Sequence, residues 1–446
     1  MGFRTSTEPG AAQRDLPAAL TWALARLDGE PLSGLEKGVP ARQGLTIGNI
    51  ADAGLNVTRG DVPTPSMSLR WDRVLHNIEL MQRYCNQNGA WLAPHGKTTM
   101  APQLYAEQLK AGAWAITIAN LPQAQVCRAF GVPRVLWANE PTTNYEIRYI
   151  AEQLRIDDGF ELYVLVDSLE GVERLASGMR AHRAGRPLQV MVEKGMPGRR
   201  CGLRDDADFE DVVHAVVREG PALEFTGVEG YEGIAPGGLT AEALKNVDGY
   251  LEQLADLMRR TLNWVPSSSR LIASGGGSFY FDRVVEYLGH TKLPEYQLVL
   301  RPGTYVTHDS QFGDSFSPFG STSPRNIGFG TFQAALEAWA GVVSHPEPDL
   351  VLLGLGRRDV PFDVANPTPL YRATPEGEVS PLGPGYQIIE LNDQHAYLRL
   401  PSGSPVEVGD LIGSGISHPC GAFDHWRTIL KTDENRNVIG AVRTFF

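Results

Sequence analysis

The sequence predicts an α/β protein in which a (β/α)8 barrel is followed by a C-terminal, mainly antiparallel β domain. From about Ser66 onward, short β-rich runs alternate with helical segments. Eight such runs fall within roughly 240 residues, which is the size and rhythm of a (β/α)8 barrel. Runs such as Tyr163–Val166 are continuously apolar, as expected of strands buried on both faces. An open doubly wound sheet is the competing architecture, and the count of eight strands favours the barrel.

The expected barrel elements follow in order along the chain. The strands are expected at Ala90–Pro94, Trp114–Ala119, Arg134–Ala138, Glu161–Val166, Gln189–Glu193, Phe225–Gly230, Arg270–Ala273 and Tyr296–Leu300. Helical spacing of apolar residues predicts one helix before the first strand and four between later strands, at Arg70–Asn86, Pro122–Phe130, Leu169–Ala184, Asp206–Arg218 and Ala241–Leu262.

The two ends of the chain differ from this pattern. After about Ser315 helical periodicity fades, and short β runs stand between Gly/Pro turns at Ala340–Ser344, Leu350–Leu353, Gln387–Leu391, Ala396–Leu400 and Leu411–Ile416. Near the start, one helix is expected at Leu16–Leu27, followed by a loop-rich connection. We therefore expect an N-terminal extension (1–61), a barrel (62–315) and a C-terminal β domain (316–446).

Composition excludes several classes of protein. With 446 residues and 42% hydrophobic composition, the chain can bury a large core. The net charge of -12 and the pI near 5.4 argue against nucleic acid as a partner, because phosphate binding requires a basic surface. The four scattered cysteines do not suit a disulfide scaffold and suggest the reducing cytoplasm. The sequence contains neither an apolar run of membrane-spanning length nor a signal peptide, so we expect no membrane association.

The most informative segment is Ala90–Lys97. Its apolar run delivers His95 and Lys97 to the C-terminal end of the first expected strand. In a parallel barrel this rim carries the chemistry. A lysine buried there loses water, so its pKa falls and its amine becomes a nucleophile or base. Most lysines at strand ends simply point into solvent.

A glycine-rich loop follows the seventh expected strand. Glycines let backbone N–H groups approach an anion closely, and barrels often bind phosphate after their last two strands. A flexible turn is the alternative. A cofactor that carries both a phosphate and an aldehyde, pyridoxal 5'-phosphate (PLP), could join this loop to Lys97. The candidate cofactor-binding residues of the loop are Ser274, Gly275, Gly276, Gly277 and Ser278.

Two further strand ends carry candidate groups. After the fifth strand, Arg199 or Arg200 could present a cation to a ring nitrogen or a carboxylate, or could form a solvent-facing turn. After the sixth strand, Tyr231 could stack on a ring or transfer protons, although a buried structural tyrosine is an equal reading.

Near the C-terminus stands the sequence Ser417-His418-Pro419-Cys420. In extended chain, side chains two apart face the same way, so His418 and Cys420 could bind one metal ion. Imidazole and thiolate are favoured zinc ligands. Two ligands alone are a weak motif. Asp424 and His425 could support them, or could be surface residues.

Together these residues resemble the alanine-racemase-like (fold type III) PLP enzymes, specifically the branch of D-threonine aldolase and D-serine dehydratase. The resemblance runs from about Thr64 to Arg427. The matching pieces, in family order, are Pro94–Thr98, Arg200–Gly202, Tyr231–Gly233, Gly275–Ser278, Arg301–Tyr305 and His418–Cys420.

The resemblance implies roles for these residues. Lys97 would form the Schiff base with PLP, Gly275–Ser278 would hold its phosphate, and Arg200 would lie near the pyridine nitrogen. His418 and Cys420 would bind a divalent metal, with zinc favoured by the thiolate. The remaining candidates are His95 and Tyr231 as catalytic residues and Ser274, Tyr231 and Tyr305 as cofactor-binding residues.

Two departures from the family pattern concern specificity. Relatives usually carry aspartate and a smaller residue where this chain has Glu193-Lys194 before Gly195. The segment Arg357–Asp363 and the long N-terminal extension are closer to a longer amino-acid deaminase subgroup than to short D-serine dehydratases.

The expected function is that of a PLP- and zinc-dependent D-3-hydroxy-amino-acid dehydratase, which yields a 2-oxo acid and ammonia. Dehydratases of this family tend to carry His-x-Cys, and aldolases His-x-Asp. The alternatives are a metal-dependent D-threonine-type aldolase, then a racemase, and, outside enzymes, a PLP-carrying homeostasis protein. The expected partner is a small D-amino acid, and the resemblance suggests a homodimer.

Overall fold

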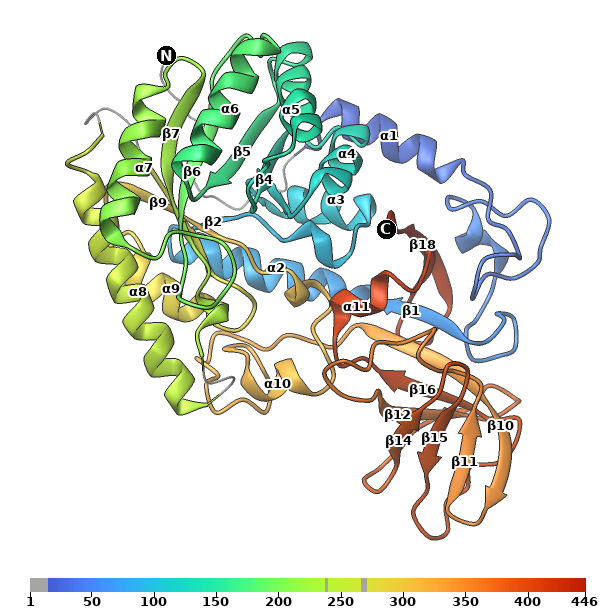
Figure 1. Ribbon diagram of the computed structural model, residues 1–446. Helices are drawn as coiled ribbons and strands as arrows, with labels where there is room; N and C mark the ends of the chain where they lie inside the picture. The colour runs from blue at the N-terminus through green and yellow to red at the C-terminus, as the bar shows by residue number, and fades with distance from the viewer. Residues whose placement is uncertain (1–14, 237–239, 266–270) are drawn as a thin grey trace. The chain divides into compact units, whose positions relative to one another are not determined.

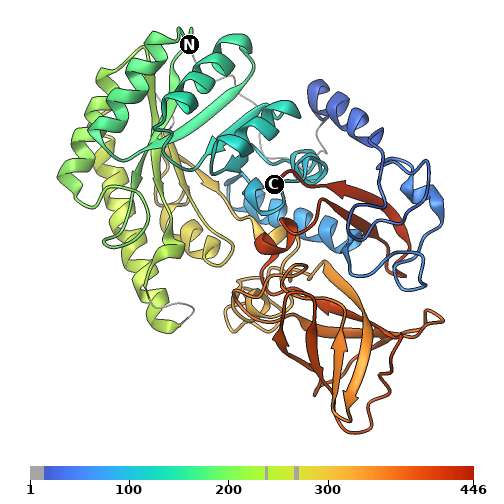
Figure 2. The ribbon, with the colours of Figure 1, turned by 45° about the vertical axis from the view of Figure 1, so that its right-hand side comes forward.

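The computed structural model describes residues 15–236, 240–265 and 271–446. These residues fall into two compact units, here called the barrel unit and the β unit (Figures 1 and 2). Of the described residues, the barrel unit contains 15–17, Met81–His95 and those within Gln108–Gly303. The β unit contains Ala18–Leu80, Gly96–Glu107 and Thr304–Phe446.

The barrel unit is built on an eight-stranded parallel sheet with the hydrogen-bonded order β2-β9-β8-β7-β6-β5-β4-β3. A parallel bridge between His95 and Thr117 links the two ends of this order. The predicted fold class, an α/β barrel with a C-terminal β domain, is confirmed. Arg270 of the seventh expected strand lies outside the described residues. The strands are β2 (Trp91–Leu92), β3 (Ile116–Ile118), β4 (Arg134–Trp137), β5 (Glu161–Val166), β6 (Leu188–Lys194), β7 (Leu223–Gly230), β8 (Leu271–Gly275) and β9 (Tyr296–Leu300).

Helices between these strands lie on the outside of the sheet (Figure 1). Side chains at their N-caps fix where several of them begin: Thr143 and Glu146 form a capping box, and Ser168 accepts the Gly171 N–H. The helices are α4 (Leu121–Ala129), α5 (Asn144–Ile156), α6 (Leu169–Ala181), α7 (Asp206–Arg218), α8 (Ala241–Thr261) and α9 (Phe281–Leu288). Two more helices, α2 (Trp71–Gln87) and α3 (Pro102–Ala111), run through parts of both units.

Aromatic side chains fill one end of the barrel. The ring centroid of Trp114 lies 5.1 Å from those of both Trp91 and Tyr163, and the Arg134 guanidinium lies 4.9 Å above Trp114. Trp91 and Arg134 are the first residues of their strands. The packed aromatic group therefore lies toward the N-terminal strand ends and leaves the C-terminal ends for the predicted site.

The β unit contains a ten-stranded sheet. Its main path has the order β13-β12-β16-β10-β1-β17-β18, and β11, β15 and β14 continue it from β10. The strands are β1 (Ser66–Arg70), β10 (Leu336–Glu347), β11 (Leu350–Leu353), β12 (Thr368–Ala373), β13 (Val379–Pro381), β14 (Gln387–Leu391), β15 (Ala396–Arg399), β16 (Leu411–Gly415), β17 (Thr428–Thr432) and β18 (Val438–Arg443). The short helices α1 (Ala18–Asp28), α10 (Phe312–Phe316) and α11 (Pro419–Phe423) belong to the same unit.

Strand β1 was not expected from the sequence. It pairs antiparallel with β10 and parallel with β17, and all five of its residues are buried. Ser66 and Ser68 are fully buried in spite of their polarity, because the strand is central in the sheet. Periodicity alone could not reveal this, since its partners lie hundreds of residues away.

All four cysteines are free. Within the described part of the chain, no helix combines the length and apolar character needed to cross a membrane.

Candidate functional site

The predicted site residues fall in both units, and each group is described within its own unit. In the barrel unit, the glycine-rich loop meets Glu232. Gly276 and Gly277 donate backbone N–H bonds to the Glu232 carboxylate over 3.0 and 2.7 Å. Burial raises the pKa of Glu232, while the two amide bonds act in the opposite direction. Two donors that the sequence assigned to an anion are thus used by Glu232, so a bound phosphate would need other donors of the loop.

Glycine is required at this loop by both conformation and space. Gly276 has a φ of +82°, and a Cβ added there would lie 2.6 Å from the Leu300 side chain. A Cβ at Gly277 would lie 2.8 Å from Cε2 of Tyr231. The loop therefore lies directly against the ring of Tyr231.

Arg200, in the loop after β6, also lies beside Tyr231. Its guanidinium carbon lies 5.3 Å from the ring centroid of Tyr231, in a cation–π contact. The side chain of Ser274 is buried, and its hydroxyl has no hydrogen-bond partner within the described part of the chain. The structure thus brings Arg200, Tyr231 and the glycine loop together.

Arg204 organises the loop that carries Arg200. Its guanidinium donates to the carbonyl oxygens of Arg199 and Cys201 over 2.7 and 2.9 Å, and also to those of Arg200 and Gly202. One side chain that satisfies four carbonyls fixes the course of an otherwise irregular loop. The sequence analysis did not single out Arg204.

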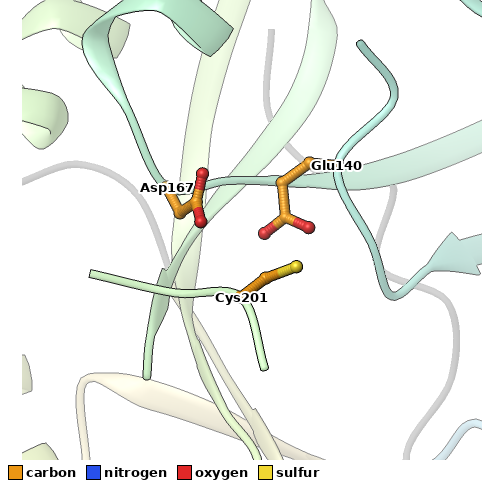
Figure 3. A group of neighbouring side chains, drawn as sticks. All are labelled: Glu140, Asp167 and Cys201. Carbon is orange, nitrogen blue, oxygen red and sulfur yellow. The ribbon is translucent and has the colours of Figure 1, made fainter. Parts of the chain in front are cut away.

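Acidic side chains converge beside this loop (Figure 3). The potential ligand atoms of Glu140, Asp167 and Cys201 all lie within 4.8 Å of one another. Asp167 accepts the Gly202 N–H at 2.9 Å. Both carboxylate oxygens of Glu140 are buried.

A fourth acid, Glu193 at the end of β6, faces the same cluster. Burial, together with the hydrogen bond and charge of Glu140, raises the pKa of Glu193 to about 9. Burial and the neighbouring acids raise the pKa of Cys201 to about 12. Near neutral pH these two groups hold protons, which limits the negative charge of the cluster. The neighbouring Lys194 is buried and pairs with Asp206 at 2.8 Å, so both residues of the unusual Glu193-Lys194 pair have defined environments.

The end of β9 supplies a buried ion pair. The guanidinium of Arg301 bonds to the carboxylate of Glu229, and its backbone N–H is shared by the carbonyls of Gly275 and Gly276, each at 3.1 Å. Burial lowers the pKa of Arg301 to about 10. This pair ties β7 and β9 to the glycine loop between them.

His95 also belongs to the barrel unit. Its backbone N–H donates to Pro302 at 3.0 Å, and its bridge to Thr117 lies on the other side. The backbone of His95 therefore contributes to closing the sheet, and this role does not depend on the imidazole.

In the β unit, Lys97 lies in a short 3-10 turn, Gly96–Thr98, and its side chain is half-buried. The hydroxyl of Tyr105 donates to the carbonyl of Gly96 at 2.9 Å and holds the turn. Tyr305 is 1% exposed and packs on Phe332 with ring centroids 6.0 Å apart.

His418 and Cys420 lie at the start of α11 in the same unit. The Nδ1 atom of His418 lies 2.7 Å from Oδ2 of Asp363. The hydrogen bond with Cys420, followed by its charge and by Asp363, raises the pKa of His418 to about 9 in spite of burial. The Cys420 Sγ lies 3.3 Å from the hydroxyl of Thr98. Imidazole and thiol are therefore adjacent, next to the turn that carries Lys97.

Several contacts were missed from the sequence. Glu232 gave no signal beyond its place after Tyr231, and Asp363 gave none beyond the unusual segment that contains it. Asp424 and His425, which the sequence offered as supports for the metal ligands or as surface residues, lie 3.9 Å from each other.

The cluster around Glu193 makes a testable prediction. Because the folded protein holds a proton on Glu193 that the unfolded chain releases above its ordinary pKa of 4.5, stability falls as pH rises from 4.5 toward 9. Glu193→Gln should remove this loss. We expect it to be more stable than wild type by on the order of 1–3 kcal/mol at pH 8, with the advantage gone at pH 4.5. Urea unfolding at both pH values measures it.

Glu173→Gln, on the exposed face of α6, is the control, and it should have nearly the same free energy of unfolding as the wild type at either pH. An equal effect of Glu193→Gln at pH 4.5 and pH 8 would contradict the assignment of the proton to Glu193.

Two family models match the chain. "Alanine racemase, N-terminal domain" matches residues 69–284, and "Putative serine dehydratase domain" matches residues 335–432. Among characterised proteins, D-threonine aldolase of Arthrobacter sp. is 25% identical over 344 residues, which cover 77% of this chain and 82% of the relative. D-threo-3-hydroxyaspartate dehydratase of Delftia sp. (strain HT23) is 29% identical over 143 residues, which cover 32% of this chain and 36% of the relative.

Solved structures share the fold. D-threonine aldolase from Filomicrobium marinum has a TM-score of 0.73 at 22% identity, covering 88% of this chain and 97% of that one. The Delftia dehydratase has a TM-score of 0.64 at 20% identity, covering 86% and 97%. The chain is thus related to D-threonine aldolase and D-threo-3-hydroxyaspartate dehydratase, and it has the alanine-racemase-like fold.

Proposed function

We propose that the protein is a PLP- and zinc-dependent dehydratase of D-3-hydroxy amino acids. The observation that carries the proposal is the contact between Thr98 and Cys420 at 3.3 Å. It connects a thiol and imidazole pair to the turn of Lys97. A lysine for the cofactor and ligands for a metal are the two parts that dehydration of such a substrate needs.

The residues of the barrel unit fit PLP. The glycine loop has no room for a Cβ at Gly276 or Gly277, and the buried hydroxyl of Ser274 lacks a described partner. We propose that the loop binds the phosphate, that Arg200 faces the pyridine nitrogen, and that Tyr231 packs against the ring. Lys97 would hold the aldehyde carbon covalently. When bound, PLP withdraws electrons from the α-carbon of the substrate and makes its proton acidic.

The residues of the β unit fit a divalent metal, by the chemistry of their donors. His418 and Cys420 would hold zinc, which would act as a Lewis acid on the substrate's β-hydroxyl. The alternative is that a different divalent ion binds to the same two ligands. The amine of Lys97 would accept the α-proton. The α-proton and β-hydroxyl leave as water, and uptake of one water then gives the 2-oxo acid and ammonia.

The relatives support this class of reaction. One of them is a D-threo-3-hydroxyaspartate dehydratase, and a cysteine mutant of that protein has been crystallised in a metal-free form. The long match to D-threonine aldolase favours a second candidate, an aldolase that cleaves the bond between the α- and β-carbons. Cys420 favours the dehydratase, since the resemblance implies aspartate there in aldolases. The resemblance supports a homodimer, and the scattered free cysteines support a cytoplasmic location, as further parts of the proposal.

Lys97→Ala tests the cofactor lysine. The variant should lack the visible absorbance of lysine-bound PLP and should lose at least about 1000-fold in turnover, because no other amine replaces the base. Absorbance and ammonia release measure the two effects. Lys110→Ala, on α3, is the control, and it should retain both the absorbance of lysine-bound PLP and the turnover of the wild type. Wild-type turnover by Lys97→Ala would remove the core of the proposal.

Product analysis tests the reaction. Purified protein with PLP and zinc should release ammonia and a 2-oxo acid from D-serine or from a diastereomer of another D-3-hydroxy amino acid. The corresponding L-amino acids should give neither product. Exhaustive chelation should abolish this release but leave PLP bound, because the two groups have separate ligands. Glycine and an aldehyde as products would establish the aldolase instead.

Glu232 provides a test of the phosphate loop. In the wild type, each of two backbone N–H groups bonds to its own oxygen of the Glu232 carboxylate. Glu232→Gln leaves only one oxygen, so one buried N–H loses its partner at a cost of about 1–3 kcal/mol. We expect PLP to bind about tenfold more weakly, as measured by absorbance titration. Glu224→Gln, at an exposed position of β7, should bind PLP as wild type does. Unchanged affinity in Glu232→Gln would mean that the loop does not depend on this carboxylate.

A further inference from the structure

The proposed metal ligands each have one specific polar partner outside the pair. We propose that Asp363 and Thr98 are positioning residues for His418 and Cys420, respectively. This inference rests on the proposed metal site. It adds two residues whose contacts the motif His-x-Cys does not reveal.

Asp363 determines which nitrogen of His418 is available. Its Oδ2 lies 2.7 Å from Nδ1 of the imidazole, a hydrogen bond in which the ring N–H donates to the carboxylate. The unshared pair for a metal is then on Nε2. Such a carboxylate fixes both the tautomer and the ring orientation and makes the ligand more basic.

The segment around Asp363 is held against α11 by contacts on both sides. A Cβ at Gly421 would lie 3.0 Å from the Cβ of Pro361, so the two backbones approach closely. On the other side of Asp363, the Ser417 hydroxyl donates to the carbonyl of Ala365 at 2.6 Å. Asp363 is 59% exposed, yet its backbone is pinned between these two contacts.

The same segment is anchored further back. Trp426 donates its indole N–H to the carbonyl of Asp359 at 2.8 Å, and Lys37 pairs with the carboxylate of Asp359 at 3.0 Å. The carboxylate of Asp359 in turn accepts the N–H of Gly356 at 3.0 Å. Because the loop is fixed in this way, the bond from Asp363 to His418 costs little additional ordering.

Thr98 performs the corresponding task for Cys420. Its side chain is 1% exposed, and its Oγ1 lies 3.3 Å from Sγ. When the thiol is ionised, only the hydroxyl can donate, so Thr98 stabilises and orients the thiolate. The turn that carries Thr98 is fixed by the bond from Tyr105 to Gly96.

The chain offers matched controls. Asp424 stands at the C-terminal end of α11, is 50% exposed, and contacts His425 rather than either ligand. Asp424→Asn removes a nearby negative charge without removing a ligand contact. Thr98→Ser retains the hydroxyl that Thr98→Val removes.

Metal affinity is the first measurement. Purified full-length protein, its metal removed, competes for Zn²⁺ with a chromophoric chelator. We expect Asp363→Ala to weaken binding about 10- to 100-fold, Asp363→Asn to fall between it and wild type, and Asp424→Asn to match wild type. Equal affinities of Asp363→Ala and Asp424→Asn would overturn the role of Asp363.

The second measurement is spectroscopic and concerns the sulfur. Cd²⁺ replaces Zn²⁺, and the thiolate-to-metal absorption is identified as the band that Cys420→Ala lacks. Loss of a hydrogen bond raises the energy of the sulfur electrons, so Thr98→Val should shift this band to longer wavelength and Thr98→Ser should not. A band that is the same in wild type and Thr98→Val would overturn the role of Thr98.

The two proposals fail in different ways. If wild type binds no Zn²⁺, or if Cys420→Ala binds it as tightly as wild type, the proposed metal site is wrong. If wild type binds Zn²⁺ through Cys420 but the Asp363 and Thr98 variants behave as their controls do, only the positioning roles are wrong.

Discussion

The hydrogen bond between Thr98 and Cys420 is the interaction on which the proposed chemistry depends. It joins residues 322 positions apart, one in the turn of Lys97 and the other at the start of α11. Thr98 is almost fully buried, so its hydroxyl needs a partner within the protein.

The barrel unit concentrates carboxylates at its C-terminal strand ends, and three of them are compensated by different means. Glu229 pairs with Arg301, Glu232 accepts two backbone amides, and Glu193 retains a proton. An anionic cofactor phosphate could not enter a region of uncompensated acids. The compensation is therefore a precondition of the proposed PLP site, and Arg200 adds the exposed positive charge beside Tyr231.

The elements that could be predicted from the sequence are those whose burial shows as a local pattern of apolar residues. The eight barrel strands were recognisable because each is a short run rich in apolar residues, and helical spacing follows four of them. Strand β1 was not, since its serines are buried only by pairing with β10 and β17. The same limit applies to the site. His418 and Cys420 form a local motif, whereas Asp363 reaches His418 across 55 residues and Glu232 reaches Gly276 across 44. Such contacts depend on tertiary packing, which no local pattern encodes.

A cysteine ligand has a definite consequence for the proposed reaction. One thiolate and one neutral imidazole would leave a bound Zn²⁺ with a single net positive charge, enough to stabilise a departing hydroxide. A hydrogen bond donated by Thr98 would withdraw charge from the sulfur and keep the metal electrophilic, whereas Asp363 would make the imidazole a stronger ligand without adding a charge to the metal itself. The two partners therefore act in opposite senses, and their balance sets how strongly a bound metal would polarise a β-hydroxyl.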